Sequence, residues 1–344
     1  MKRLLLAARS TFAALAIFLA AAPVVSPAER AAAPAHVAST SSSVAPAKQY
    51  RRIVSFSPGV TEIIYKLGGQ DRLVGISSFS DYPPEAAKEK PQVGAILNVD
   101  AEKILSLRPD LIISPPGAMA KEKLTRLGAD VEFLPDKTLD DLAKSFVRIG
   151  ELVGRPAEGR ALSAELASAV AAAKKRNASR PPVKTLIVIG YEPMWVAGGY
   201  GVVDELLLAG GGQNVAGAVR KDFYAVSFES VLASEPDVIV DLTLPDDAEQ
   251  AARDAIVAFW KRFPTIPAVK NGRIEFVDID LLTIPGPRLV DGLARLEKAL
   301  RPQESLAPRP RPADAPSPAS GGSGSEPSGA RQMTNDASRG GGSK

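Results

Sequence analysis

The chain has 344 residues, 45% of them apolar, and a formal net charge of +3. This length allows one large core or two ordinary ones, and the balanced charge does not favour nucleic-acid binding. The chain has no cysteine, which excludes thiolate metal sites and a lipoprotein anchor. Its single histidine, His36, lies in the N-terminal region outside the expected folded part and leaves little basis for a histidine metal site or a Ser-His-Asp triad.

The first segment, residues 1–28, is typical of a cleavable secretory signal peptide. Three basic residues precede the apolar run 11–25, and Ser26 and Ala28 fit positions three and one before a cleavage site. The run is shorter than the roughly 20 residues of a membrane span, with an uncleaved anchor as the alternative. We therefore expect an exported, most simply periplasmic, protein whose Ala-, Ser- and Pro-rich residues 29–49 form a flexible linker.

Short apolar strands alternate with helical stretches across residues 50–301. The segment LDDLAKSFVRIGELVG, for example, spaces its apolar residues by three and four positions, as in an amphipathic helix. This alternation predicts an α/β fold with mostly parallel sheets covered by helices. The expected strands are Ile53–Ser57, Leu73–Ile76, Leu111–Ser114, Val131–Leu134, Thr185–Gly190, Val238–Leu242 and Ile274–Val277.

One long helix is predicted near the middle of the chain, over residues 155–179. Pro156 suits a first helical turn, and the Ala-rich body that follows has high helix propensity. About 23 helical residues span roughly 35 Å. We expect this helix to join an N-terminal lobe, residues 50–154, to a C-terminal lobe, residues 180–301. A single stiff helix between the lobes limits how far they can close on each other, and the cleft between them is the expected ligand site.

Two pairs of segments indicate that the lobes are duplicates. Residues 99–113 and 226–240 share six identities in fifteen positions, and residues 60–72 and 203–215 share five in thirteen. Both matches keep the same order along the chain. Two copies of about 100 to 120 residues fit a pair of related α/β lobes rather than a solenoid.

Each copy also carries a glutamate just inside a predicted helix. Glu102 lies two residues after Asp100, and Glu229 lies two residues after Ser227. Asp and Ser are preferred N-cap residues, so both glutamates fall in a first turn, beside the positive end of the helix dipole. They either stabilise these helices alone or, as a symmetric pair, engage cationic groups on a twofold partner. Exposed ion pairs of that kind set register and encounter rate more than affinity.

The glutamate blocks, the stretch RRIVSFSPGVTEIIYKLGGQDRLVGISSFSDYPP and the late PGPRLVDGLARLEKAL resemble the helical-backbone (class III) periplasmic substrate-binding proteins of ABC importers. The resemblance runs from about residue 51 to 301. The most similar branch binds cobalamin, and SSFSDYPP is its most specific piece, whereas the glutamate blocks also occur in ferric-siderophore and haem binders.

The resemblance implies an extracytoplasmic protein that carries a corrinoid, either cobalamin or cobinamide, in its cleft and delivers it to an ABC importer. It implies a monomer without catalytic residues, resident metal or cofactor. It also implies that Glu102 and Glu229 contact arginines of the dimeric permease. A ferric siderophore or haem is the alternative ligand.

The resemblance further implies five ligand contacts. Tyr82 in SDYPP matches a ligand-contacting tyrosine, and Asp280 matches an aspartate at the cleft. Trp195, Phe223 and Tyr224 fall where the family has ligand-contacting aromatic residues. A corrin has broad apolar faces and an edge of amides, which aromatic walls and a few dipolar groups suit. Packing in the core is the alternative role for each ring.

The sequence also departs from the cobalamin branch. At two positions where that branch has aromatic residues, this chain has Ile96 and Pro115. The missing aromatic rings weaken the cobalamin assignment more than the transporter assignment. A siderophore, usually anionic, would need several convergent Arg or Tyr groups, and Arg220 and Arg288 do not form such a cluster. Trp260 lies in an amphipathic stretch and is assigned to packing.

Two other functional classes fit less well. Neither GGYG at residues 198–201 nor GGG at residues 210–212 matches a nucleotide-binding motif, and Asp246 with Asp247 is typical of a helix start, so an enzyme is disfavoured. A tether or scaffold protein would rely on residues 302–344, whose Pro, Ser and Gly content predicts disorder.

Overall fold

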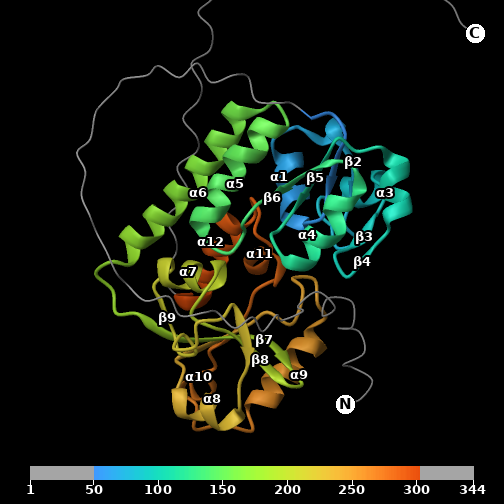
Figure 1. Cartoon of the computed structure of the whole chain (residues 1–344). Helices are drawn as coiled ribbons and strands as arrows, with labels where there is room; N and C mark the ends of the chain where they lie inside the picture. Colours follow the sequence, from blue (N-terminus) through green and yellow to red (C-terminus); the bar gives the residue numbers. More distant parts are fainter. Residues whose placement is uncertain (1–49, 303–344) are drawn as a thin grey trace, which may run out of the picture. The chain divides into compact units, whose positions relative to one another are not determined.

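The structure, a computed structural model, describes residues 50–302 (Figure 1). The predicted signal peptide, the predicted linker and residues 303–344 of the predicted tail lie outside the described residues. Within residues 50–302, no helix is both long enough and apolar enough to cross a membrane.

The first lobe is built around a four-stranded parallel sheet in the order β2-β1-β5-β6. Its two central strands are buried along their whole length, as expected when helices cover both faces of a parallel sheet. The strands are β1 (Ile53–Ser55), β2 (Leu73–Ile76), β5 (Leu111–Ser114) and β6 (Asp130–Phe133). The remaining elements are α1 (Pro58–Lys66), α2 (Pro84–Glu89), α3 (Ala101–Leu107), α4 (Ala118–Leu124), α5 (Leu139–Leu152), the short helices η3 (Gln70–Arg72) and η4 (Thr125–Leu127), and the hairpin β3 (Gly94–Ala95) and β4 (Asn98–Val99).

The second lobe is built around a mixed sheet in the order β10-β8-β7-β11-β12, with β9 paired to β7. Strands β9, β11 and β12 continue the parallel pattern, whereas β8 pairs antiparallel with β7 and β10. The strands are β7 (Val183–Tyr191), β8 (Met194–Ala197), β9 (Gly212–Asn214), β10 (Phe223–Ala225), β11 (Val238–Asp241) and β12 (Ile274–Phe276). The helices are α7 (Val202–Ala209), α8 (Phe228–Ser234), α9 (Gln250–Trp260), α10 (Pro267–Lys270), α11 (Asp280–Thr283) and α12 (Leu289–Leu300).

The duplication inferred from the sequence is confirmed by the topology. The strand order β2-β1-β5-β6 of the first lobe recurs as β9-β7-β11-β12 in the second. The repeated helices α3 and α8 also begin and end with the same local geometry. Asp100 and Ser227 each cap the helix by accepting a hydrogen bond from the backbone three residues on. Each helix stops at a left-handed residue, Arg108 or Glu235, both with φ of 45°.

The long helix is α6 (Pro156–Asn177), of 22 residues, and it packs against α5, α7 and α12 (Figure 1). Gly150 of α5 and Gly159 of α6 let the two helices approach closely, since a Cβ on Gly159 would lie 2.6 Å from the Phe146 carbonyl oxygen. The central hydrophobic core draws residues from both sheets, and a separate outer core lies in each lobe. The exact lobe boundaries therefore stay a prediction.

Candidate ligand-binding site

A cavity of about 550 Å³ is lined by residues of both lobes. The first lobe contributes residues that follow β1, β2, β5 and β6, which are the carboxyl ends of its parallel strands. Ligands of open α/β sheets bind in the crevice at these ends. The second lobe contributes residues of β7, β8 and β10, the start of α7 and the segment after β12. The volume falls in the range of about 300 to 1,000 Å³ that is usual for ligand sites.

The structure places four of the five predicted ligand residues in the lining: Tyr82, Trp195, Phe223 and Asp280. Tyr224 does not line the cavity. Neighbouring side chains of a strand point to opposite faces, so in β10 only one of the two rings can face the cavity. The ring of Tyr224 packs in the outer core of the second lobe, and its hydroxyl donates a hydrogen bond to the Ala216 carbonyl oxygen at 3.2 Å.

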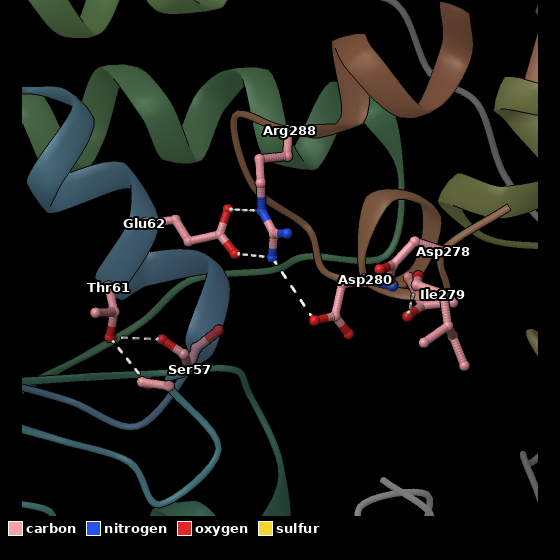
Figure 2. Close-up of polar contacts among 9 residues, drawn as sticks. Ser57, Thr61, Glu62, Asp278, Ile279, Asp280 and Arg288 are labelled. Carbon is pink, nitrogen blue, oxygen red and sulfur yellow. Dashed lines mark hydrogen bonds and ion pairs between the residues drawn. The ribbon is translucent and has the colours of Figure 1, made fainter. Parts of the chain in front are cut away.

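An ion pair between Glu62 of α1 and Arg288, the residue before α12, joins the two lobes at the cavity wall (Figure 2). It is bidentate: Arg288 Nε donates to one carboxylate oxygen at 3.0 Å and Nη2 donates to the other at 2.6 Å. The Glu62 side chain is only 2% exposed. Burial raises the pKa of Glu62, and the hydrogen bonds from Arg288 oppose that rise. Sequence reasoning missed this pair, whose members are 226 positions apart.

Arg288 also orders the cavity wall beyond Glu62. Its guanidinium carbon lies 4.2 Å from the centre of the Tyr82 ring, within the range of a cation–π contact. Its Nη2 lies 3.9 Å from the Asp280 carboxylate (Figure 2). Burial raises the pKa of Asp280, and the neighbouring Asp278 adds to the rise while Arg288 opposes it. Two predicted ligand residues thus share one cation that is already paired.

On another part of the lining, Lys137 of the first lobe and Asp222 of the second form an ion pair at 2.6 Å. Close by in the sequence, the backbone N–H of Leu139 donates to the Glu205 carboxylate of α7 at 2.7 Å. Burial also raises the pKa of Asp136, which lines the cavity beside Lys137, and the Lys137 ammonium opposes that rise.

The two cross-lobe glutamates occupy equivalent positions of the repeat, VTE and VDE. Glu62 of α1 reaches the segment after β12, the last strand of the second lobe. Glu205 of α7 reaches the segment after β6, the last strand of the first lobe. When each half contacts the equivalent part of the other, the relation between them is that of a twofold axis. The lobes are therefore related by a pseudo-twofold.

The chemistry of the lining is aromatic and acidic. Within the described chain, six aromatic side chains face the cavity: Phe56, Phe79, Tyr82, Trp195, Tyr200 and Phe223. Five carboxyl groups accompany them: Glu62, Asp81, Asp136, Asp222 and Asp280. The cations of the described lining are Lys137 and Arg288, and both are held in ion pairs. No group of three potential metal ligands occurs among residues 50–302.

Three of the six aromatic residues, Phe56, Phe79 and Tyr200, were not predicted from the sequence. Phe56 follows β1 directly, and Phe79 and Tyr200 lie three residues after the ends of β2 and β8. An aromatic residue within three positions after a strand is therefore the sequence feature that could have identified them.

Residues 53–280 match the family model described as periplasmic binding protein. The chain belongs to the periplasmic binding protein family. The vitamin B12-binding protein of Yersinia pestis (strain Pestoides F) is 29% identical over 227 residues, which cover 65% of this chain and 79% of that protein. The family and the fold are those of solute-binding proteins, and the family implies a periplasmic location.

Two solved structures extend this similarity. The periplasmic vitamin B12-binding protein BtuF of Vibrio cholerae superposes with a TM-score of 0.64 at 28% identity, covering 73% of this chain and 96% of that one. A periplasmic haem-binding protein from Pseudomonas aeruginosa gives a TM-score of 0.62 at 31% identity, covering 74% and 94%. Similarity alone therefore leaves the ligand open within this family.

The glutamates predicted to dock a permease lie away from the cavity lining. Glu102 and Glu229 are both exposed, each in the first turn of its short helix, α3 or α8. Hydrogen bonds from its own backbone N–H and from the Ser227 hydroxyl lower the pKa of Glu229, so this carboxylate stays ionised at neutral pH. Their role in docking stays a prediction.

The remaining residues singled out from the sequence have clear positions. Trp260 is fully buried in the outer core of the second lobe, and its indole N–H donates to the Tyr191 hydroxyl at 2.8 Å, which confirms the packing role. Ile96 packs against the outer core of the first lobe. Pro115 lines the cavity, and the Arg220 guanidinium lies 5.9 Å from the centre of the Tyr200 ring.

Proposed function

We propose that the protein captures a corrinoid, cobalamin or cobinamide, in the cavity between its lobes and delivers it to the permease of an ABC importer. The observation that carries the proposal is the lining itself: aromatic rings from both lobes, with carboxyl groups in excess of cations and both cations already paired.

The rings fit the broad apolar faces of a corrin. Tyr82 belongs to the first lobe and Trp195 to the second, so a flat macrocycle between the lobes would meet an aromatic ring from each. Aromatic side chains bury large apolar areas, and Tyr and Trp add a polar group that can hydrogen-bond. The amides at the edge of the macrocycle supply N–H donors, for which the carboxyl groups of the lining are acceptors.

The charge of the lining separates the ligand candidates. Haem carries propionates, and siderophores are usually anionic. Five carboxyl groups face two cations in the described lining, and those cations are already held in ion pairs. An anionic ligand would therefore face like charges across a partly desolvated cavity, where repulsion is strongest. A neutral or cationic corrinoid avoids this cost.

The relatives support the same ligand class, because the similar proteins of Yersinia pestis and Vibrio cholerae are named for vitamin B12 binding. Haem is the second candidate, favoured by the similarity to the haem-binding protein of Pseudomonas aeruginosa. The acidic lining is the reason for preferring the corrinoid.

Delivery completes the proposal. The exposed Glu102 and Glu229 lie at equivalent places on the two lobes, and a pseudo-twofold pair of carboxylates matches a dimeric permease with one cationic group per subunit. Export by a signal peptide over residues 1–28 belongs to the same proposal, and the N-terminal sequence of the mature protein would test it.

Titration calorimetry of the full-length secreted protein tests the ligand assignment. The panel consists of cyanocobalamin, cobinamide, haem and a ferric hydroxamate. We expect saturable binding of one corrinoid per protein and much weaker binding of the two anionic ligands. Tight haem binding without corrinoid binding would replace the first candidate by the second, and turnover of a ligand would argue for an enzyme.

A further inference from the structure

The repeated helices α3 and α8 agree in sequence at only two of their seven positions. The helix sequences are AEKILSL and FESVLAS, and the identical pairs are Glu102 with Glu229 and Leu105 with Leu232. All four of these side chains are exposed, Leu105 at 54% and Leu232 at 37%. The agreement between the two copies is therefore confined to the solvent-facing side of each helix.

Folding alone does not explain this pattern. The position that faces the core is Ile104 in α3 and Val231 in α8, 0% and 1% exposed, and there the copies are merely similar. A core position constrains volume and shape, whereas an exposed position makes almost no demand on the fold. A single exposed leucine is ordinary. Two of them at equivalent positions, each beside an equivalent carboxylate, call for a common role.

The geometry makes the two exposed pairs alike. Residues three apart on a helix lie on the same face, so each leucine lies one turn after its glutamate. Both helices start with a capped first turn and stop at a residue with φ of 45° and ψ near 60°. The reciprocal contacts of Glu62 and Glu205 relate the lobes by a pseudo-twofold. The molecule thus displays one Glu-x-x-Leu surface twice, in a twofold relation.

We propose that Leu105 and Leu232 are apolar anchors for the membrane permease of an ABC importer, one for each of two equivalent permease subunits. The inference rests on the proposed function and adds to it, because the glutamates then set the register of docking while the leucines supply most of its affinity. An exposed ion pair contributes little, whereas an apolar side chain that is fully desolvated at an interface contributes more. The permease surface that fits would place a cationic group about one helical turn from an apolar pocket.

Transport by whole cells tests the anchors. Cells of the source organism that lack their own copy would express the full chain with Leu105→Ser, Leu232→Ser or both changes, and uptake of radiolabelled cyanocobalamin would be measured. Leu208→Ser is the matched control, because this leucine of α7 is 55% exposed and its counterpart in the repeat is Tyr65. Calorimetry with cyanocobalamin and thermal unfolding would be run on every variant.

We expect the two single variants to reduce uptake by similar factors and the double variant to reduce it about tenfold or more, as for central interface residues. Affinity for cyanocobalamin and the unfolding midpoint should match the unsubstituted protein, and Leu208→Ser should transport normally. Normal uptake by the double variant would overturn the inference while leaving the ligand assignment intact.

Photo-crosslinking tests whether the surface around Leu105 and Leu232 contacts the permease, and it does not depend on any ligand. A photoreactive amino acid would replace Leu105 or Leu232 in otherwise unchanged protein, and crosslinked membrane proteins would be identified by mass spectrometry. Crosslinks from both positions to the same polytopic permease subunit support the anchors. Crosslinks at neither position, with permease crosslinks recovered from position 102 or 229, would overturn them. Failure of the unsubstituted protein to bind cyanocobalamin would instead count against the proposed ligand.

Discussion

Each lobe contacts the other through a glutamate at an equivalent position of the repeat, but the two glutamates have different hydrogen-bond partners. Glu62 of the first lobe is 2% exposed and forms a bidentate ion pair with Arg288, which also stacks on Tyr82. Glu205 of the second lobe is half-buried and accepts a hydrogen bond from the N–H of Leu139, the first residue of α5.

The difference shows how a duplicated position acquires separate roles. The contact of Glu205 lies at a helix N-terminus, where the helix dipole favours a carboxylate. The contact of Glu62 instead brings a cation to the cavity wall and neutralises it there. One half of the repeat thus supplies a purely structural link, and the other links the lobes while it shapes the candidate ligand site.

The largest expected effect is on stability. Glu62→Ala leaves the guanidinium of Arg288 without its main partner at a largely buried place, which costs about 3 to 5 kcal/mol of unfolding free energy. Glu205→Ala, the matched change in the other lobe, removes one charge-assisted hydrogen bond and should cost about 1 to 2 kcal/mol. Urea denaturation measures both. Equal losses for the two variants would show that the lobes do not differ in this way.

The next effect is on ligand affinity, with one ring tested from each lobe. Tyr82→Ala and Trp195→Ala should each weaken corrinoid binding by about 1 to 3 kcal/mol, because each ring would be desolvated against the ligand. Titration calorimetry with cyanocobalamin or cobinamide measures the change. Leu208→Ser, at a residue outside the lining, serves as the control. An unchanged dissociation constant for either aromatic variant would assign that ring to packing.

A third comparison concerns pH and the ends of two equivalent strands. Asp241 closes β11 and is fully buried, whereas its counterpart at the end of β5 is Ser114. Burial raises the pKa of Asp241 above its ordinary value of 3.8, and hydrogen bonds from Thr243 and Tyr191 oppose the rise.

Because the folded pKa of Asp241 is the higher one, its contribution to stability is complete below the unfolded pKa and is lost as the pH rises through the folded pKa. The unfolding free energy of the unsubstituted protein should therefore fall relative to that of Asp241→Asn as the pH increases from about 4. Ser114→Ala should leave the pH profile unchanged. Denaturation curves at a series of pH values check this, and parallel curves for the Asp241→Asn and unsubstituted proteins would contradict it.

The smallest expected effect is on affinity when the exposed glutamates are changed. Reversing the charge of Glu102 and Glu229 to lysine should leave the corrinoid dissociation constant nearly unchanged, since neither residue lines the cavity. Uptake by cells should fall, because like charges would meet at the docking surface. Calorimetry and a radiolabel uptake assay separate the two steps. Normal uptake would show that neither residue is needed for docking to the permease.

The sequence predicted the fold well where local signals were strong. Each expected strand is present, because short segments rich in β-branched and other apolar residues between helical stretches are typical of the buried strands of a parallel sheet. The strands β3, β4, β8, β9 and β10 were missed; β3, β4, β9 and β10 have only two or three residues, and β8 pairs antiparallel with β7 outside the parallel pattern. The repeat predicted two lobes because identities recurred in the same order, and the shared strand order bears this out.

The candidate site was less accessible from the sequence. Trp195 and Tyr82 were proposed through the resemblance, and both line the cavity. Tyr224 was grouped with Phe223, but only Phe223 lines the cavity, because strand alternation turns neighbouring side chains to opposite faces. The pairing of Glu62 with Arg288 depends on how the second lobe lies against α1, and no local pattern contains that information.

Hydrogen–deuterium exchange with and without cyanocobalamin tests the central claim most directly, because it reports which backbone segments a ligand covers. If the ligand lies between the lobes, protection should increase in both lobes, around residues 56–62 and 79–82 in the first and 195–203 and 279–288 in the second. Protection confined to one lobe, or an unchanged exchange pattern at saturating cyanocobalamin, would contradict the account.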